Sequence, residues 1–455
     1  PGLKRDGAAF IADAKARGAV AVVVAAKRQP CPLPQIAVND PARAASVLAN
    51  LFHGSPSRTM RTFAITGTNG KTTTAYLVRH LLGKVGQRCG MMGTVEIDDG
   101  GSRREAEMTT PDACFVAQAL ATMRDRGCRA AVLEASSHAL DQSRLAGVRF
   151  AGAAFTNLTG DHLDYHQTTE NYAAAKARLF EALDADAVAV VNADSAFADR
   201  MIQNCPSRMI RFGFGNRADY RATGARVTAA GSSFMLHTPD GKAEVSMKLI
   251  GRHNIENALT AAALVGEAAG LTIHQIAAGL RDAEGAPGRL QTVDAGQPFA
   301  VLVDYAHTDD ALKNVLDALR PLCKGKLRVI FGCGGDRDAS KRPRMAKVAE
   351  KIADVVYVTS DNPRTEDPDQ IIQQIAAGFV GKAGGTDGAN GIKPVIVEPD
   401  RRRAIELALH DAQGDDVVLI AGKGHENYQI VGTEKHHFDD VEEAKRVLQG
   451  QSAAA

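Results

Sequence analysis

The sequence predicts an α/β protein in which two groups of parallel strands alternate with helices. Apolar runs of four or five residues recur along the chain, and longer helical patterns lie between them. This alternation builds parallel sheets that are covered by helices. Hydrophobic residues make up 45% and charged residues 24% of the 455 residues, which is typical of soluble globular chains. The length favours about three domains.

Composition disfavours several functional classes. With 54 basic and 53 acidic side chains the formal charge is +1, so the chain lacks the basic field of a dedicated nucleic-acid-binding protein. The longest apolar run, 19–26, is far shorter than the ~20 residues that span a bilayer, and it predicts a buried strand instead. The seven cysteines are scattered without a C-x-x-C pair, and the start of the chain shows no secretory leader. Both features favour a reducing, cytoplasmic compartment.

Three segments follow from the pattern. Residues 1–39 are expected to be a fragment of a small α/β unit with a helix over 8–17. Residues 40–286 are expected to form a central domain, which a Gly- and Pro-containing linker separates from a C-terminal domain of residues 287–455. In the central domain we predict strands over 62–66, 130–134, 151–155 and 187–191, helices over 42–52, 71–82, 255–269 and 273–281, and antiparallel ribbons over 219–250.

The C-terminal domain is predicted to be a second, doubly wound sheet. Its strands are expected over 300–303, 327–331, 355–359, 394–397 and 417–421, and 381–391 is expected to be a Gly-rich surface loop. Open sheets of this kind bind ligands beyond the carboxyl ends of their strands. The loops at those ends carry charged groups flanked by glycine, namely 304–307, 332–337, 361–364, 400–401 and 422–426. We therefore expect a binding site there.

The strongest local motif is Thr66-Gly67-Thr68-Asn69-Gly70-Lys71-Thr72-Thr73, which follows a predicted strand and opens a helix. Backbone N–H groups of such a loop bind phosphate oxygens. Lys71 would neutralise the β- and γ-phosphates, and Thr72 would ligate Mg²⁺. The motif departs from the usual pattern at Ile65, where a glycine is common, and an ordinary glycine turn is the alternative.

Other polar groups follow the central strands. Glu134 ends an apolar strand and is placed to hold Mg²⁺, although a helix-capping acid is the alternative. Asp161, His162 and Asp164 could bind a second ion or be a solvated turn. Lys176 lies among alanines in a predicted helix, and composition alone indicates a solvated helix lysine.

Further along the chain, His253 and Asn254 open a helix, where they could cap it or face a nucleotide. Arg289 follows the linker and could reach phosphates. Asp304 could hold a ribose hydroxyl or form a turn.

The loops of the last domain contain groups that suit a zwitterion. The guanidinium groups of Arg337 and Arg364 can each bind a carboxylate with two hydrogen bonds. Glu426 suits an ammonium group. Each of these alone is more often a surface charge, but together they predict a site for an amino acid.

The motifs GTNGKTT, TTPDA, EASSH, TNLTGDHLDYH, YAAAKARLF, GRHNIENA, APGR, DYAHT, GCGGDRD, SDNPRTEDP and AGKGHENYQ run in order from residue 66 to 429. This series resembles the Mur ligases of bacterial peptidoglycan synthesis, and within them the branch that uses meso-diaminopimelate. The resemblance implies three domains: an N-terminal domain for the UDP-substrate, which is incomplete here, a central ATPase domain with a phosphate loop, and a Rossmann-like C-terminal domain for the amino acid.

The resemblance also implies roles for individual residues. ATP contacts are implied for Gly67, Thr68, Asn69, Gly70, Lys71, Thr72, Thr73, Asn257, Arg289 and Asp304. Metal contacts to Mg²⁺ are implied for Thr72, Glu134, His162 and Lys176, the last as a carbamate. Lys71, Lys176, His162 and Arg289 are implied to be catalytic.

Two substrate sites follow from the same resemblance. Contacts to the UDP-muramoyl dipeptide are implied for Thr109, Thr110, Ser136, Gln142 and Arg144. Contacts to diaminopimelate are implied for Arg337, Asp361, Asn362, Pro363, Arg364, Gly422 and Glu426. Leu3 to Arg5 match part of the uridine site, and family members continue further at the N-terminus.

The implied reaction is ATP-dependent amide formation. Meso-diaminopimelate would be added to the D-Glu side-chain carboxylate of UDP-MurNAc-L-Ala-D-Glu through an acyl phosphate. The implied enzyme is a cytoplasmic monomer that binds no nucleic acid and does not insert into membranes, and cell wall formation, cell shape and cell division would depend on it. A folylpolyglutamate synthase-like ligase is the nearest alternative, and a nucleotide-dependent switch is an alternative from another class.

Overall fold

The computed structural model describes residues 6–27, 29–160, 162–228, 230–380 and 393–452. It divides into two compact units. The first contains Pro1–Thr223, Met235–Glu244 and Glu256–Leu280, and the second contains Gly224–Phe234, Val245–Ile255 and Arg281–Ala455. The expected domain boundaries after residues 39 and 286 stay predictions. The matched residues Leu3 to Arg5 and the expected loop 381–391 lie outside the described residues.

The chain starts with a small α/β segment. A 3₁₀ turn, η1 (Gly7–Phe10), leads into helix α1 (Ile11–Ala16), and strands β1 (Val22–Val24) and β2 (Gln35–Ala37) pair in parallel. The predicted buried strand over 19–26 is wrong, because β1 has three half-buried residues and Val20 is 83% exposed. The reason is that β1 and β2 form a sheet of their own, with two strands only. Helix α2 (Pro41–Phe52) follows, and Asp40 caps it.

The first unit contains most of an eleven-stranded sheet with the order β13-β12-β11-β10-β9-β8-β3-β7-β4-β5-β6. Strands β10, β9, β8, β3, β7 and β4 pair in parallel with one another, as predicted for the central domain, whereas β4 and β5 pair antiparallel. The strands are β3 (Arg61–Thr66), β4 (Cys89–Met92), β5 (Glu96–Asp98), β6 (Arg103–Glu105), β7 (Ala130–Glu134), β8 (Gly152–Phe155), β9 (Val188–Asn192), β10 (Arg208–Gly213), β11 (Tyr220–Thr228), β12 (Gly231–Thr238) and β13 (Gly241–Met247). The prediction missed β4, β5, β6 and β10.

The region 219–250 forms the ribbons that the sequence predicts. Strands β12 and β13 are neighbours in the sheet, and only Pro239 and Asp240 connect them. Two residues can join only antiparallel strands, since a parallel connection needs a crossover of a dozen residues or more.

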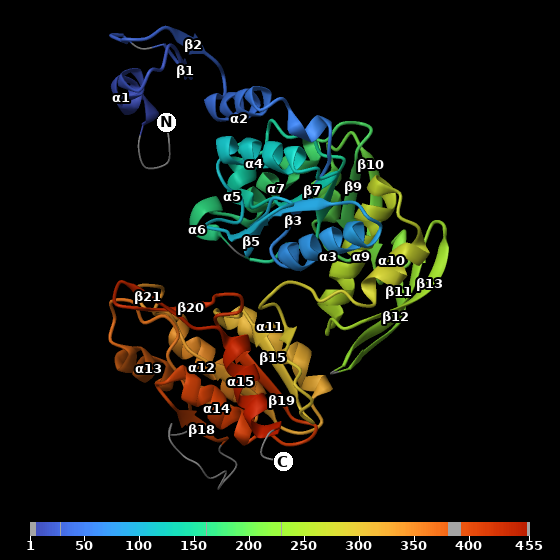
Figure 1. Cartoon of the computed structure of the whole chain (residues 1–455), viewed down its shortest axis with the longest axis vertical. Helices are drawn as coiled ribbons and strands as arrows, with labels where there is room; N and C mark the ends of the chain where they lie inside the picture. Colours follow the sequence, from blue (N-terminus) through green and yellow to red (C-terminus); the bar gives the residue numbers. More distant parts are fainter. Residues whose placement is uncertain (1–5, 28, 161, 229, 381–392, 453–455) are drawn as a thin grey trace. The chain divides into compact units, whose positions relative to one another are not determined.

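Helices cover both faces of the central strands (Figure 1). Ala64 of β3 packs into an apolar cluster with residues of α4, α5, α7 and α8. Its neighbours Phe63 and Ile65, which are fully buried, point to the opposite face, where α3, α9 and α10 lie. Burial on both faces explains why these strands are continuously apolar rather than alternating. The helices are α3 (Lys71–Lys84), α4 (Ala113–Asp125), α5 (Ser137–Asp141), α6 (Leu163–His166), α7 (Thr169–Glu181), α8 (Ala198–Ile202), α9 (Arg252–Ala269) and α10 (Ile273–Leu280).

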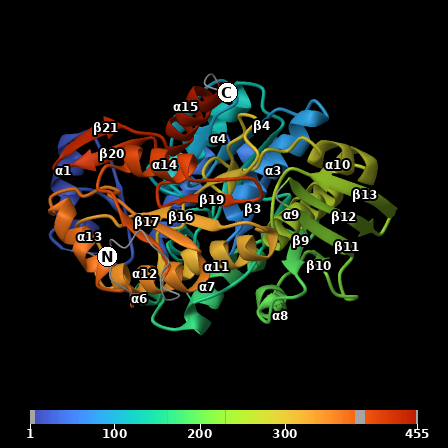
Figure 2. The ribbon, with the colours of Figure 1, turned by 90° about the horizontal axis from the view of Figure 1, so that it is seen from below.

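The second unit has a six-stranded sheet with the order β14-β15-β19-β16-β17-β18, parallel except at β14. Its strands are β14 (Gln291–Thr292), β15 (Ala300–Asp304), β16 (Leu327–Phe331), β17 (Val355–Val358), β18 (Val395–Val397) and β19 (Val417–Ala421). Helices α11 (Asp309–Leu319), α12 (Lys341–Ile352) and α13 (Pro368–Ala376) cover one face, while α14 (Arg401–His410) and α15 (Asp440–Ser452) cover the other (Figure 2). The predicted doubly wound sheet is confirmed.

An antiparallel hairpin, β20 (Tyr428–Val431) and β21 (Glu434–His437), extends from this unit and was not predicted. Among the described residues, we find no helix with the length and apolar character needed to span a bilayer.

Candidate active site

The loop between β3 and α3 has the geometry of a phosphate-binding loop. Gly67 and Gly70 have φ angles of +146° and +85°. A Cβ atom on Gly67 would lie 2.0 Å from Thr156 Oγ1, and one on Gly70 would lie 2.3 Å from Asn257 Oδ1. Among the described residues no side chain caps α3 at Gly70. The first N–H groups of this helix therefore face the loop, where they can donate hydrogen bonds to an anion.

Two side chains fix this loop. Lys71 Nζ donates to the carbonyl oxygens of Gly67 and Thr68 at 2.9 and 2.8 Å, which holds the ammonium group over the loop. Asn157, just after β8, accepts from the Asn69 N–H at 2.9 Å and donates to the Asn69 carbonyl at 3.2 Å. No role was predicted for Asn157 from the sequence. Its signal is its position beyond the strand that neighbours β3 in the parallel sheet.

Glu134 ends β7 and is 1% exposed. Its Oε2 accepts from the hydroxyls of Thr72 and Thr94 at 3.0 and 2.9 Å, and its Oε1 accepts from the Thr94 N–H at 2.9 Å. A Cβ atom on Gly93 would lie 2.2 Å from Oε1. The alternative of a helix-capping acid is wrong, because the Ser136 hydroxyl caps the next helix. Glu134 and Thr72 instead bring two oxygen ligands together, the type that Mg²⁺ prefers.

Lys176 on α7 is 1% exposed, so the composition-based interpretation of a solvated lysine is wrong. Its Nζ donates to the Gly67 carbonyl at 3.0 Å and lies 4.4 Å from the centre of the Tyr172 ring. The small side chains of Ala173 and Ala177 on the same helix pack into the core. This packing lets the helix face lie close to the core, so that Lys176 reaches the phosphate loop.

His162 adopts a left-handed backbone conformation with φ +54°. Its ring lies 4.9 Å from that of His138 and 6.0 Å from that of Tyr172, and the Tyr172 hydroxyl lies 3.2 Å from Thr68 Oγ1. Asp161 lies outside the described residues. Within the described part of the chain, no group of three or more His, Cys, Asp or Glu side chains is arranged to hold a metal ion.

The residues implied to contact the UDP-substrate converge beside Glu134. Thr109 Oγ1 lies 3.1 Å from Thr94 Oγ1, and the Thr110 hydroxyl donates to the Glu134 carbonyl at 2.7 Å. The remaining contacts connect Ser136 N to Thr110 Oγ1 at 3.0 Å, Arg144 Nη1 to the Thr110 carbonyl at 2.7 Å, and Arg144 Nη2 to Gln142 Oε1 at 2.7 Å. Thr109, Thr110, Ser136, Gln142 and Arg144 thus belong to one network that continues through Thr94 and Glu134 to Thr72.

Three further residues are implied to contact the nucleotide. Of these, Asn257 shares the first unit with the phosphate loop and accepts from the Thr74 hydroxyl at 3.4 Å. Arg289 and Asp304 belong to the second unit, where the Arg289 guanidinium lies 4.9 Å from the Tyr305 ring centre. Asp304 accepts from the N–H groups of Leu290 and Ala306 at 2.7 and 2.8 Å. These are the bonds of an aspartate that shapes a turn, and a ribose contact by Asp304 stays a prediction. Burial raises the pKa of the Asp304 carboxyl.

His253 and Asn254, near the start of α9, are not among the residues implied to contact the nucleotide. Asn254 Nδ2 donates to the Ile250 carbonyl at 2.9 Å, which fixes the start of α9. The side chain of His253, at the start of the same helix, is exposed.

In the second unit, Lys423, Asn362 and Glu426 form a hydrogen-bonded series. Lys423 is fully buried, and its Nζ donates to Asn362 Oδ1 at 3.1 Å and to the Tyr428 carbonyl at 2.6 Å. Because Asn362 Oδ1 also accepts from the Ile430 N–H at 2.9 Å, its Nδ2 is turned to Glu426 Oε2, at 2.8 Å. Lys423 lies within the predicted loop 422–426, but the sequence pattern predicted no role for it.

Asp361 and Gly422 form the floor of the same cluster. Lys423 Nζ lies 3.5 Å from Asp361 Oδ1, and a Cβ atom on Gly422 would lie 2.6 Å from Asp361 Oδ2. Burial alone would raise the pKa of the Asp361 carboxyl, but the charges of Lys423 and Arg401 outweigh it and hold that pKa below its usual range. Asp361 is therefore an ionised, buried carboxylate.

Arg364 and Arg337 both approach Gly334. A Cβ atom on Gly334 would lie 2.9 Å from Arg364 Nη1 and 3.9 Å from Arg337 Cγ. Arg364 has a φ of +52°, and its Nη1 donates to the Gly335 carbonyl at 2.8 Å. Pro363 packs its carbonyl against Gly335, 1.9 Å from where a Cβ would be. The structure thus brings the predicted arginines and Glu426 to loops at one edge of the sheet.

Electrostatics at this edge favour a cationic ligand beside Glu426. Burial, with the nearby Asp361 charge, raises the pKa of the Glu426 carboxyl. Burial and the Arg289 charge lower the pKa of His425 to about 4, so this imidazole is neutral at physiological pH. The cluster therefore combines the carboxyl groups of Asp361 and Glu426 with the guanidinium groups of Arg337 and Arg364.

A phosphate loop on one α/β unit and a zwitterion-matched cluster on a second define an ATP-dependent ligase. Residues 65–265 match the Mur ligase middle domain, and residues 288–424 match the Mur ligase glutamate ligase domain. The chain belongs to the Mur ligase family. It is 45% identical to UDP-N-acetylmuramoyl-L-alanyl-D-glutamate–2,6-diaminopimelate ligase of Thermosynechococcus vestitus, over 98% of this chain and 89% of that relative.

Solved structures agree with this membership. A structure of a UDP-N-acetylmuramoyl-L-alanyl-D-glutamate–2,6-diaminopimelate ligase is 37% identical, with a TM-score of 0.72 over 98% of this chain and 90% of that one. The folylpolyglutamate synthase of Mycobacterium tuberculosis, complexed with ADP and AMPPCP, has a TM-score of 0.66 over 84% of this chain and 93% of that one. Its identity is only 20%, so this second likeness concerns the fold alone.

Proposed function

We propose that this ligase adds meso-diaminopimelate to the D-Glu side-chain carboxylate of UDP-MurNAc-L-Ala-D-Glu, at the cost of one ATP. The observation that carries the proposal is that Asn362 donates to Glu426 while the nearby Arg364 guanidinium donates to the Gly335 carbonyl, in a chain 45% identical to a ligase named for these substrates. The enzyme is proposed to act as a monomer in the bacterial cytoplasm, in the peptidoglycan synthesis on which cell shape and division depend.

The phosphate loop has the first task. An amine does not displace oxide from a carboxylate, so the carboxylate must first acquire a better leaving group. A carboxylate oxygen of D-Glu attacks the γ-phosphorus of ATP, the bond to ADP breaks, and an acyl phosphate forms. The N–H groups of the loop and Lys71 bind the phosphate oxygens, and Arg289 adds positive charge as phosphoryl transfer proceeds.

Thr72 and Glu134 fit a magnesium ion, since their oxygens already lie 3.0 Å apart. When bound, Mg²⁺ would neutralise charge on the phosphate oxygens. His162 is proposed to complete its surroundings together with a carbamate on Lys176. That carbamate forms when the Lys176 amine bonds to the carbon of CO₂ and loses a proton, which replaces a cation by an anion beside Gly67.

The C-terminal cluster has the second task. Diaminopimelate carries two carboxylates and two amino groups. Arg364, with Arg337, binds the carboxylate distant from the reaction, and Glu426 and Asp361 hold an ammonium group. The free amine then attacks the acyl carbon, the C–O bond to phosphate breaks, and the amide forms as the amine loses its proton. Positioning the two reactants is the main contribution of the protein.

The test is phosphate release from ATP with UDP-MurNAc-L-Ala-D-Glu and meso-diaminopimelate, L-lysine or no amino acid. We expect release only with diaminopimelate. Release with lysine would keep the ligase but overturn the role of Arg364, and release without an amino acid would favour a nucleotide switch. Release with a folate and glutamate, but not with the muramoyl substrate, would favour the folylpolyglutamate synthase alternative.

The role of Lys176 has its own test. We expect Lys176→Ala to abolish diaminopimelate-dependent phosphate release and short added carboxylates to restore part of it, because they replace the carbamate. Lys84→Ala, at the exposed end of α3, is the matched control and keeps full activity. Full activity of Lys176→Ala without any addition would contradict the carbamate.

A further inference from the structure

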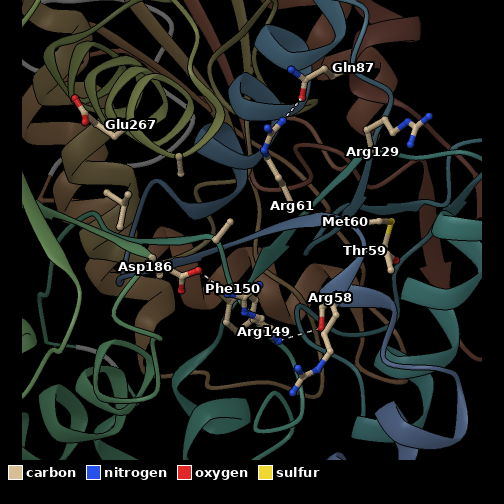
Figure 3. A pocket seen from close by; sticks show the side chains of 15 residues that line it. Arg58, Thr59, Met60, Arg61, Gln87, Arg129, Arg149, Phe150, Asp186 and Glu267 are labelled. Carbon is tan, nitrogen blue, oxygen red and sulfur yellow. Dashed lines mark hydrogen bonds and ion pairs between the residues drawn. The ribbon is translucent and has the colours of Figure 1, made fainter.

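A cavity of about 520 Å³ opens at the edge of the central sheet opposite the phosphate loop (Figure 3). Arg61, which lines the cavity, begins β3, and Val188, which also lines it, begins β9. The phosphate loop follows the other end of β3, at Thr66. Five steps of about 3.3 Å place the two ends roughly 17 Å apart along the strand, so this cavity is separate from the nucleotide site.

Four arginines line the cavity: Arg58, Arg61, Arg129 and Arg149. Two acidic residues, Asp186 and Glu267, also line it, but both are already neutralised. Asp186 accepts from Arg149 at 2.6 Å. Glu267 accepts from Arg208 at 2.7 Å and from the Tyr220 hydroxyl at 3.0 Å.

The positive charges of the other three arginines, Arg58, Arg61 and Arg129, are not neutralised by a carboxylate among the described residues. In the described part of the chain, the side chains of Arg58 and Arg129 make no hydrogen bond or ion pair, and the Arg61 guanidinium reaches only the neutral Gln87 amide, at 3.3 Å. Figure 3 shows Arg61 and Arg129 on one side of the cavity and Arg58 and Arg149 on the other. Three uncompensated cations around one cavity indicate an anionic ligand, because guanidinium forks match phosphate and carboxylate oxygens.

The walls between the arginines are partly apolar. Phe150 is buried beneath the cavity and Val188 also lines it. A volume of about 520 Å³ falls in the range of sites for small molecules and exceeds what one phosphate fills. The separated cations call for an anion with more than one charged group.

We propose that this cavity binds a small polyanion with at least two phosphate groups. The proposal does not depend on the ligase reaction. Its minimal probe is inorganic pyrophosphate, which carries two linked phosphates and no base or sugar.

The experiment titrates pyrophosphate into the full chain and maps the binding by amide hydrogen exchange. We expect two protected segments, one at residues 67–73 and one at residues 58–61 and 149–151. In the double variant Arg58→Glu/Arg129→Glu, the second protection should weaken at least about tenfold in pyrophosphate concentration while the first persists. Added NaCl should weaken the second site in the wild type, since salt screens exposed charges.

Arg217→Glu/Arg226→Glu is the matched control, because both side chains are exposed and neither lines the cavity. Protection confined to residues 67–73 would overturn the proposal, as would equal weakening in the control. Retained protection at residues 67–73 shows that the double variant is folded. If it is not folded, Arg58→Gln/Arg129→Gln removes the charges without reversing them and decides the same question.

Discussion

The Thr72 hydroxyl donates a 3.0 Å hydrogen bond to Glu134, a residue 62 positions later in the chain. This bond joins the phosphate loop to the end of the neighbouring parallel strand. Thr94 adds two bonds to the same carboxylate and contacts Thr109. The proposed metal ligands and the proposed UDP-substrate contacts therefore share one carboxylate, and moving it should disturb both.

Gly93→Ala tests this relationship without removing any polar group. The added Cβ would lie 2.2 Å from Glu134 Oε1, so the carboxylate must move. We expect kcat for diaminopimelate-dependent phosphate release to fall by about a hundredfold, because small misplacements at reacting groups have effects of that size. Gly83→Ala is the control: no described heavy atom lies within 4 Å of its Cβ, and in a helix it should be neutral or stabilising. Equal activity of both variants would show that the position of Glu134 does not matter.

Arg364→Lys tests amino-acid recognition. Lysine keeps the charge but loses the planar fork that binds a carboxylate at two points, and it loses the bond to the Gly335 carbonyl. We expect KM for diaminopimelate to rise about tenfold or more and KM for ATP to stay unchanged. Steady-state phosphate release at varied amino acid measures both constants. Arg403→Lys, at an exposed ion pair on α14, is the control. An unchanged KM for diaminopimelate would remove Arg364 from the site.

The sequence predicted the parts of the site that local patterns encode. The phosphate loop is one such part, since Gly67, Gly70, Lys71 and Thr72 are contiguous and lie between a strand and a helix. The loops at the carboxyl ends of the C-terminal strands are another, because parallel strands bring these ends to one edge. The doubly wound sheet was predicted from the regular alternation of strands and helices, and the structure confirms it.

Contacts between distant residues could not be predicted in this way. Asn157 fixes Asn69 from 88 positions away, and Lys176 reaches Gly67 from 109 positions away. No periodicity in either segment signals these pairs. The local sequence also does not indicate whether a charged side chain is buried. Lys176 and Lys423 cannot be told from surface lysines until their hydrogen-bond partners are known. Strand β4 was missed because Gly90 interrupts its apolar run, and β5 was missed because Ile97 is the single apolar residue among its three.

Asp416→Asn tests the electrostatics of the second unit. Asp416 accepts from the Lys326 and Gln413 N–H groups and from Arg328 Nε, at 2.6, 3.1 and 3.1 Å. Burial opposes its ionisation, but these groups outweigh burial and hold the pKa of Asp416 below its usual range. Its contribution to stability is therefore present above the unfolded pKa of about 4 and is lost as pH falls through the folded pKa.

We expect Asp416→Asn to lower the free energy of unfolding by about 3 kcal/mol at pH 7, because the buried Arg328 keeps its bonds to Tyr357 and Asp411 but loses the carboxylate that pairs with its charge. Urea unfolding at pH 7 and at pH 3 measures the difference between variant and wild type. That difference should shrink at the lower pH, where Asp416 begins to be protonated in the wild type as well. A difference independent of pH would mean that packing, not charge, is responsible. Asp415→Asn, at the exposed neighbouring position, is the control.

Lys423→Met tests whether a buried lysine positions the amino-acid cluster without touching the substrate. Lys423 fixes Asn362 Oδ1, and Asn362 in turn donates to Glu426. Without Lys423 the Asn362 amide can rotate, and Glu426 loses its fixed donor. We expect KM for diaminopimelate to rise about tenfold, while KM for ATP is unchanged. Lys435→Met, an exposed lysine on the adjacent hairpin, is the control.

A pH profile separates positioning by Lys423 from simple loss of stability. The positive charge of Lys423 opposes the burial that raises the pKa of Glu426. Removing that charge should raise the pKa of Glu426 further, so the acid limb of kcat/KM for diaminopimelate should move to higher pH. A destabilised but correctly arranged site would lower activity at every pH and leave the limb where it is. An unmoved limb with an unchanged KM would show that Lys423 only fills the core, because its charge acts on Glu426 directly and its hydrogen bond acts on Glu426 through Asn362.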